Sequence, residues 1–198
     1  MREGLITKEE ALERIAGIDL AALVEISLVA AGKPVVAGIG ASGGIAVGRA
    51  AFSSESAERL AAAGDPVILM RPDTSTADVA GFAAAAGIVT AVGARTAHAA
   101  LVARQMGKPC IVGCGSMTVD VAADRAQLAG ITLSGSDWVT IDGTSGNIYP
   151  GRRDTVETRP EAELAEIAGW RSQTADRAHD GHEPKSPRHQ ARHGAAGA

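Results

Sequence analysis

Short apolar runs alternate with stretches that favour helix through the middle of this 198-residue chain. Strands are expected at residues 66–71, 88–92 and 110–112, and helices at residues 54–63, 76–85 and 97–106. This rhythm is typical of an α/β fold in which helices pack on a parallel or mixed sheet. Ligands gather beyond the carboxyl ends of the strands in such sheets. Residues 93–98, directly after one expected strand, are therefore a candidate site.

The turn after that strand leads into a helix that carries a histidine. Gly93 breaks the apolar run, Thr96 is expected to be the N-cap, and Gly107 is expected to end the helix. His98 then lies in the first helical turn. Unsatisfied backbone N–H groups and the positive end of the helix dipole favour an anion there. The position therefore suits a phosphorylated ring.

His98 is the only histidine in the part of the chain that is expected to fold. The other histidines lie in a polar tail and are His179, His182, His189 and His193. A neutral ring nitrogen can attack a phosphoryl group and form a phosphoramidate. A histidine that only packs or caps a helix is the commoner alternative, and these residues alone leave it open.

Residues 93–110 read Gly-Ala-Arg-Thr-Ala-His-Ala-Ala-Leu-Val-Ala-Arg-Gln-Met-Gly-Lys-Pro-Cys. This run resembles the phosphohistidine signature of the PEP-utilising enzymes, most of all that of pyruvate, phosphate dikinase. The matching positions are Gly93, Thr96, His98, Ala99, Ala100, Val102, Ala103, Arg104, Gly107, Lys108, Pro109 and Cys110. Residues 67–75 and then Asp78 and Gly81 are similar to a strand and loop of the same domain, and residues 139–149 to its closing hairpin.

The resemblance implies the fold of the swivelling β/β/α phosphohistidine domain, with His98 as the residue that carries the phosphoryl group. Arg95 would screen the charge that develops during transfer, and Thr96 would fix the helix start. The backbone N–H groups of Ala99 and Ala100 would contact phosphate oxygens. In some plant relatives the threonine at the position of Thr96 is a regulatory phosphorylation site, so Thr96 is a candidate for the same regulation.

Some positions depart from the family's usual residues. Ala94 stands in place of a glycine, and Ala97 stands where a serine or cysteine usually precedes the histidine. Ala97 removes a hydroxyl that could help to bind phosphate, so any defect is expected as a slower rate. The glycine-rich residues 40–44 precede no helix and contain no phosphate-binding GxxxxGK(S/T) motif. We attribute these glycines to strand geometry.

The chain is expected to divide into a folded domain and flanking segments. These are a helical linker at residues 1–31, the phosphohistidine domain at residues 32–151, a linker helix at residues 152–174 and a disordered tail at residues 175–198. Thr7 and Glu10 form a capping box for a helix that is predicted to run to residue 24. This first helix either packs on its own domain or links to another one, and the resemblance favours the linker. A second amphipathic helix is predicted over residues 160–173.

Composition limits the function further. A net charge of −4 argues against a nucleic-acid surface, and no apolar run is long enough to span a membrane. The first residues do not resemble a signal peptide, so the cytoplasm is the expected location. Cys110 and Cys114 lack a second pair and are expected to pack as small apolar side chains, with no metal site. Lys108 either neutralises a bound phosphate or lies in a solvated turn.

The family resemblance also implies partners. In the relatives a flanking domain uses ATP to phosphorylate the histidine. A separate barrel domain then passes the phosphoryl group to pyruvate to form PEP. Both active sites use Mg²⁺. This chain is too short for either domain, so it is expected to be an incomplete phosphotransferase component. It would bind no cofactor itself and would work with ATP-binding and PEP/pyruvate-binding partners. The alternatives are a carrier in a PEP-dependent phosphotransfer chain, a non-catalytic regulator of a dikinase, and a remnant without a role.

Overall fold

The computed structural model describes residues 6–29 and 32–180. The chain divides into two units, and each is described by itself. One unit contains Met1–Leu23 and Arg159–Ala198, and the larger unit is Val24–Thr158. The larger unit holds the strands and helices that surround His98.

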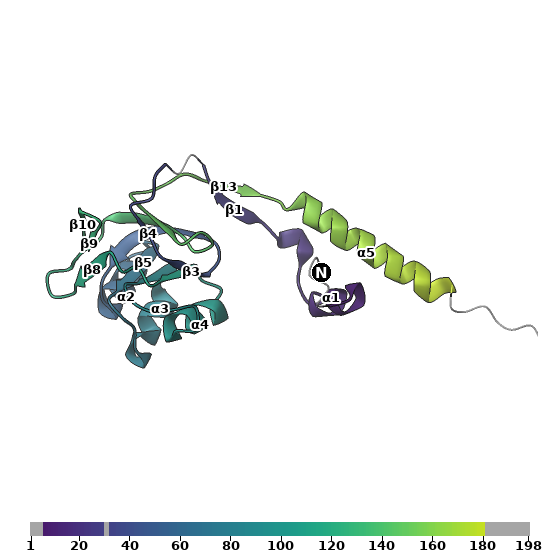
Figure 1. Cartoon of the computed structure of the whole chain (residues 1–198), viewed down its shortest axis with the longest axis horizontal. Helices are drawn as coiled ribbons and strands as arrows, with labels where there is room; N and C mark the ends of the chain where they lie inside the picture. Colours follow the sequence, from purple (N-terminus) through teal and green to yellow (C-terminus); the bar gives the residue numbers. More distant parts are fainter. Residues whose placement is uncertain (1–5, 30–31, 181–198) are drawn as a thin grey trace, which may run out of the picture. The chain divides into compact units, whose positions relative to one another are not determined.

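An eight-stranded mixed sheet lies at the centre of the larger unit (Figure 1). Its strand order is β2-β12-β11-β4-β5-β6-β7-β3. The strands are β2 (Val36–Ala37), β3 (Ile39–Ser42), β4 (Ile45–Ala51), β5 (Val67–Arg71), β6 (Gly87–Thr90), β7 (Cys110–Val112), β11 (Trp138–Asp142) and β12 (Asn147–Pro150). The neighbours β4, β5, β6 and β7 run parallel, and the remaining pairs are antiparallel. The predicted alternation of strands and helices is confirmed.

The two edges of this sheet meet. Strands β2 and β3 lie at opposite ends of the strand order, yet only Gly38 separates them in the chain. The sheet therefore has to curl until its edges come together. At this seam the backbones approach so closely that a Cβ on Gly40 would lie 2.5 Å from the carbonyl oxygen of Gly143. These glycines serve strand geometry, as the sequence predicts.

Three helices cover one face of the sheet, namely α2 (Ser54–Ala62), α3 (Val79–Ala84) and α4 (His98–Gln105) (Figure 1). Side chains of β5 alternate between the two faces. Val67 and Leu69 pack in the cluster that contains the helices, whereas Ile68 and Met70 pack in the cluster on the other side. Both faces of the central strands are therefore buried, as is typical of parallel strands.

A three-stranded antiparallel sheet contributes to the second cluster. Its strands are β8 (Met117–Asp120), β9 (Arg125–Leu128) and β10 (Ile131–Ser134). This sheet was not predicted, although β9 alternates polar and apolar residues: Arg125 and Gln127 are exposed, and Ala126 and Leu128 are buried. With helices on one side and this sheet on the other, the predicted α/β class and β/β/α layering are confirmed.

The flanking elements differ from the prediction in their bounds. The capping box of Thr7 and Glu10 is confirmed, but helix α1 spans only Lys8–Arg14 and the predicted extension to residue 24 is wrong. Gly17 follows closely and disfavours helix. A 3₁₀ turn at η1 (Leu20–Ala22) follows, and then β1 (Glu25–Leu28), which pairs with β13 (Thr155–Thr158).

The second predicted linker helix is present as α5 (Glu161–Asp180). Residues 175–180, predicted to begin a disordered tail, are the last residues of this helix. The rest of the predicted tail, residues 181–198, lies outside the described residues, as do residues 1–5 and 30–31 of the predicted first linker. Within the described ranges, none of the helices has the length and apolar character needed to cross a membrane.

Candidate functional site

The turn between β6 and α4 carries His98. Gly93 has a φ of +119°, a conformation that L side chains rarely adopt. The Ala97 N–H donates to the Ala94 carbonyl at 2.8 Å, and Ala97 is extended, with φ −64° and ψ 157°. Ala97 is therefore the N-cap, and α4 begins at His98. The predicted place of His98 in the first helical turn is confirmed.

The prediction that Thr96 is the N-cap is wrong. Thr96 lies one residue before the cap, in the tight turn, and is exposed. The hydrogen bond that closes this turn ends at Ala97, so the helix starts one residue later than the side-chain preferences of the sequence suggest. The hydroxyl of Thr96 is thus not needed to start the helix.

In the part of the chain that the structure describes, no side chain caps the start of α4. By contrast, capping boxes open α1 at Thr7, α2 at Ser53 and the 3₁₀ turn η2 (Thr76–Asp78) at Ser75. The side chains of Ala99 and Ala100 are buried against the sheet and anchor the first turn of α4. The backbone N–H groups of that turn have no side-chain acceptor among residues 6–29 and 32–180, which is the usual condition of an anion site at a helix start.

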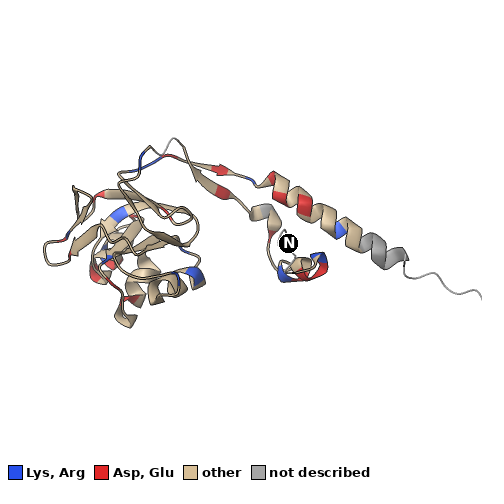
Figure 2. Ribbon diagram, in the orientation of Figure 1, with Lys and Arg blue, Asp and Glu red and all other residues tan. Residues whose placement is uncertain are grey.

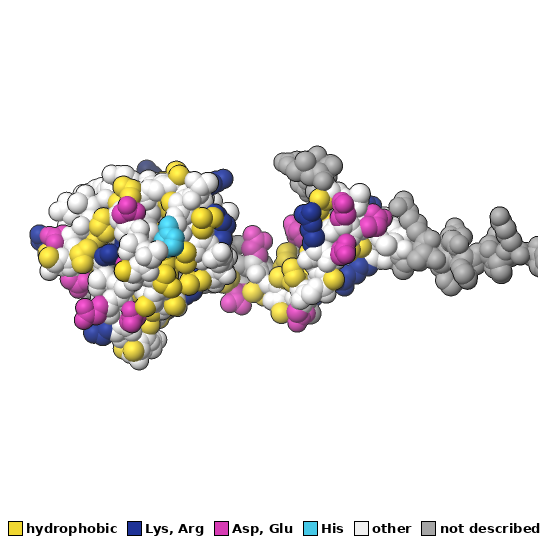
Figure 3. Space-filling view, turned by 90° about the horizontal axis from the view of Figure 1, so that it is seen from below, with side chains coloured by type: hydrophobic (Ala, Val, Ile, Leu, Met, Phe, Trp, Pro, Cys, Tyr) yellow, Lys and Arg dark blue, Asp and Glu magenta, His cyan; other side chains and the backbone are white. Residues whose placement is uncertain are grey.

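The imidazole of His98 is exposed, and Figure 3 shows a histidine on the surface of the larger unit with apolar side chains beside it. Its ring lies beside the ring of Phe82, with 6.4 Å between the centroids and 44° between the planes. Across the part of the chain that the structure describes, no group hydrogen-bonds to either ring nitrogen. Both nitrogens are therefore available to a ligand or to solvent.

Arginine side chains tie the His98 turn to strand β3. Arg104 donates to the Arg95 carbonyl at 2.9 Å and to the Ala41 carbonyl at 2.8 Å. The Nε of Arg95 donates to the Gly40 carbonyl at 3.0 Å. Nε of the Arg95 guanidinium thus binds the backbone. Among the described residues the Nη groups of Arg95 make no hydrogen bond. Arg104 belongs to the signature run, but its tethering role was not predicted.

Lys108 has a structural role that neither sequence interpretation included. Its Nζ donates to the carbonyl oxygens of Phe82, Ala83 and Ala85 at 2.8, 2.5 and 2.6 Å. These carbonyls belong to the end of α3, where a helix leaves its acceptors unsatisfied. Burial lowers the pKa of Lys108 from its ordinary value. Lys108 is therefore a cap for α3, not a solvated turn residue or a group directed at phosphate.

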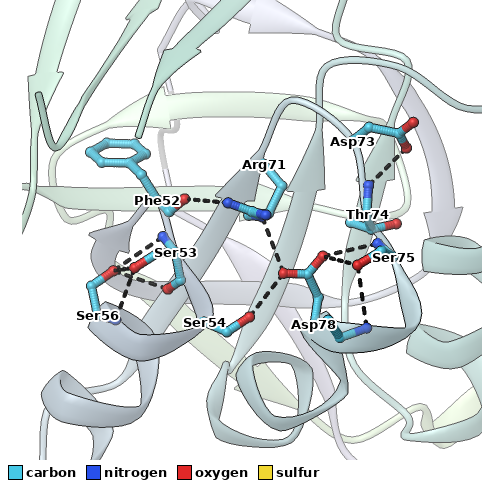
Figure 4. Close-up of polar contacts among 10 residues, drawn as sticks. Phe52, Ser53, Ser54, Ser56, Arg71, Asp73, Thr74, Ser75 and Asp78 are labelled. Carbon is cyan, nitrogen blue, oxygen red and sulfur yellow. Dashed lines mark hydrogen bonds and ion pairs between the residues drawn. The ribbon is translucent and has the colours of Figure 1, made fainter. Parts of the chain in front are cut away.

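The neighbouring turn, between β5 and α3, is closed by polar contacts (Figure 4). Asp78 accepts from the Ser54 hydroxyl and from the Ser75 N–H, each at 2.9 Å, and lies 3.3 Å from Nε of Arg71. Burial raises the pKa of Asp78, but these hydrogen bonds and the charge of Arg71 outweigh it and hold the pKa below its ordinary value. Asp78 is therefore an ionised anchor for this turn.

The residues before Asp78 serve the same turn. The Ser75 hydroxyl accepts from the Ala77 N–H at 3.2 Å, and the Asp73 carboxylate accepts from the Thr74 N–H at 2.7 Å. Asp73, Thr74 and Ser75 thus form the start of the helical segment that follows. The predicted helix over residues 76–85 is divided into η2 and α3.

The two cysteines lie in the core. Cys110 and Cys114 are free and fully buried. Burial raises the pKa of Cys110 to about 12 and that of Cys114 to about 11, so both thiols stay protonated at neutral pH. The predicted packing role is confirmed. Among the described residues no His, Cys, Asp and Glu side chains are grouped so that they could hold a metal ion.

Comparison with known proteins connects this site to a family. Residues 63–146 match the PEP-utilising enzyme, mobile domain. Pyruvate, phosphate dikinase of Clostridium symbiosum is 37% identical over 172 residues, which are 85% of this chain and 20% of that protein. The dikinase of Rhizobium meliloti is 39% identical over 170 residues, 85% of this chain and 19% of the relative. That of Entamoeba histolytica is 42% identical over 153 residues, 76% and 17% respectively.

The chain thus spans about a fifth of the length of these curated relatives. An Enzyme I protein whose solution structure was solved by NMR aligns with 54% of this chain and 38% of its own at 24% identity, with a TM-score of 0.32. The matched residues 63–146 include β5, the His98 turn, α4 and β11. Residues 63–146 therefore match the mobile domain of the PEP-utilising enzymes, and the chain is similar over most of its length to part of pyruvate, phosphate dikinases.

Proposed function

We propose that this chain is a phosphocarrier in which a ring nitrogen of His98 accepts a phosphoryl group and later passes it on. The observation that supports this most is the combination of an exposed imidazole, with both nitrogens free of hydrogen bonds, and a helix start that no side chain caps. The donor and acceptor would be partner domains or subunits, one with an ATP site and one with a pyruvate/PEP site. Mg²⁺ would be bound by those partners, and this chain would need no cofactor of its own.

The chemistry requires little beyond position and charge. The lone pair of a neutral ring nitrogen attacks phosphorus, the P–O bond to the donor breaks, and a P–N bond forms. In the second half the P–N bond breaks as an oxygen of the acceptor attacks. The backbone N–H groups of Ala99 and Ala100 and the Nη groups of Arg95 would stabilise the negative phosphoryl oxygens.

Thr96 would be a regulatory phosphorylation site. Its side chain is exposed in the turn and caps nothing. A phosphate on Thr96 would bring negative charge to the start of α4, where it would compete with a second phosphate on His98. We therefore expect phosphorylation of Thr96 to inhibit phosphorylation of His98.

The surface around the site is suited to a protein partner. Val92 and Leu101, which flank the His98 turn in the sequence, are 52% and 49% exposed. Acidic and basic residues are interspersed along the ribbon of the larger unit (Figure 2). These exposed apolar side chains and the net charge of −4 support docking to protein partners and not to nucleic acid.

Phosphorylation with purified donors tests the proposal. The chain is incubated with the ATP-binding portion of a dikinase, ATP, Mg²⁺ and phosphate, or with a PEP-binding barrel, PEP and Mg²⁺. We expect a mass gain of one phosphoryl group that is labile in acid and stable in alkali. His98→Ala should abolish it, and the matched control His179→Ala should retain it. No phosphorylation of the wild type by either donor would contradict the proposal and would favour a non-catalytic regulator.

A further inference from the structure

Phe82 is the one aromatic ring that pairs with the imidazole of His98 among the described residues. The centroid separation of 6.4 Å and the 44° tilt fall in the range at which aromatic rings attract each other. No hydrogen bond fixes either ring nitrogen within the described chain. An exposed imidazole without polar contacts can rotate between rotamers, so contact with a fixed ring would restrict it.

Phe82 is itself held firmly. Its side chain is fully buried in the cluster between the helices and the sheet. Lys108 holds the carbonyl end of α3 through its bonds to the Phe82 and Ala85 carbonyls, and Asp78 holds the other end. Phe82 therefore offers a rigid surface beside a side chain that is otherwise free to turn.

We propose that Phe82 is a positioning residue, whose ring holds the imidazole of His98 so that one particular ring nitrogen faces the phosphoryl donor. The inference rests on the proposed function, because it takes His98 as the phosphoryl acceptor. Phe82 does not touch the phosphoryl group and acts only through the orientation of the imidazole. Lys108 contributes indirectly, since it fixes the helix that carries Phe82.

The chain provides a matched pair of variants. Phe82→Leu keeps an apolar side chain in the core but removes the ring. Phe52→Leu makes the same change at the only other phenylalanine, which is equally buried but packs in the cluster on the opposite face of the sheet. Both variants lose core packing, and only Phe82→Leu loses the contact with His98. Phe82→Tyr keeps the ring and should behave as wild type.

The first measurement does not depend on phosphorylation. In the histidine-labelled full chain, His98 ring signals are assigned by their loss in His98→Ala. We expect these signals to shift in Phe82→Leu, because the ring current of Phe82 is lost, and to stay in place in Phe52→Leu. In the wild type, nuclear Overhauser contacts between the two rings should be present, and this test needs no variant.

The second measurement uses potassium phosphoramidate, a small donor that needs no partner protein. A ring nitrogen attacks its phosphorus, the donor's P–N bond breaks, and ammonia leaves as the new P–N bond forms. Phosphorus NMR distinguishes the two ring-nitrogen products. The wild type and Phe52→Leu should give one product at His98, whereas Phe82→Leu should give both and react about threefold to tenfold more slowly.

Each outcome is decisive for the inference. Unchanged ring signals and a single product in Phe82→Leu would overturn it and leave the carrier function untouched. Equal changes in both leucine variants would also overturn it, because general loss of packing would then be the cause. If His98 of the wild type accepts no phosphoryl group from any donor, the proposed function fails, and the ring signals still decide whether Phe82 orients the imidazole.

Discussion

Two neighbouring turns leave the carboxyl ends of adjacent parallel strands, and they are built in opposite ways. After β5, the side chains of Ser75 and Asp78 accept hydrogen bonds from backbone N–H groups at the helix start. Asp78 also accepts from Ser54 and pairs with Arg71 (Figure 4). After β6, α4 starts behind Ala97 without a side-chain cap and leaves His98 exposed. The first turn uses its polar groups to hold the fold, whereas the second leaves its helix start without a side-chain acceptor among the described residues.

The uncapped helix start lowers the stability of the second turn. An alanine N-cap forgoes about 1 kcal/mol relative to serine or aspartate. The turn is held instead from outside the helix start, by Arg104 and Arg95 on the carbonyls of β3. Such tethers stabilise the backbone without occupying the first N–H groups of α4. The arrangement therefore combines an ordered turn with a helix start that no side chain of the described residues caps.

The largest effect is expected at the closed turn. Asp78→Ala should lower the free energy of unfolding by about 2–4 kcal/mol, because it leaves Arg71, Ser54 and the Ser75 N–H without their acceptor. Urea denaturation measures this. The control Asp73→Ala removes one exposed acceptor and should cost no more than about 0.5 kcal/mol. Similar losses in the two variants would contradict the view that Asp78 is the anchor.

The same carboxylate predicts a pH dependence. The pKa of Asp78 is lower in the folded chain than its ordinary value, so its ionisation adds stability that is complete above an unfolded pKa of about 4. That stability is lost as the pH falls through the lower, folded pKa. Urea unfolding between pH 6 and pH 3 should therefore show a steeper loss for wild type than for Asp78→Asn. Parallel curves for the two proteins would refute the assignment.

A smaller effect is expected from the tether of the open turn. Arg104→Ala removes the hydrogen bonds to the Arg95 and Ala41 carbonyls and should cost about 1 kcal/mol. Hydrogen exchange at the Ala97 amide should become faster, because the turn that it closes is less restrained. Gln105→Ala is the control on the same helix. If Ala97 exchanges at the wild-type rate in Arg104→Ala, the tether is not what orders the turn.

A gain in stability is expected when the open helix start is closed. Ala97→Ser places a hydroxyl at the N-cap and should raise the free energy of unfolding by about 0.5–1 kcal/mol. Thermal and urea unfolding test this. A destabilised or unaltered protein would show that the start of α4 cannot accept a cap.

The smallest effect is expected one residue earlier. Thr96→Ala should change stability by less than about 0.5 kcal/mol, because Thr96 is exposed and does not cap α4. A loss near 1 kcal/mol in calorimetry would restore Thr96 as the functional cap. Together with Ala97→Ser, this variant locates the true start of the helix.

Local rules predicted much of the fold. The strands β5 and β7 follow from apolar runs with β-branched residues bounded by Gly and Pro, because these residues limit the backbone directly. Helix α2 follows from a run of good helix formers that ends before Gly64. The capping box at Thr7 and the helix start near Ser75 were predictable for the same reason. At Thr96 the rule failed, since a backbone hydrogen bond inside the turn outweighed the side-chain preference.

The sequence by itself determined that a helix begins beside a lone histidine after a buried strand, because periodicity and glycine placement act within a few residues. Only the tertiary structure decided what surrounds that histidine. The ring of Phe82, the Lys108 cap on α3 and the Arg104 tether to Ala41 each join residues distant in the chain. Such contacts depend on how the layers pack, and no local pattern encodes them.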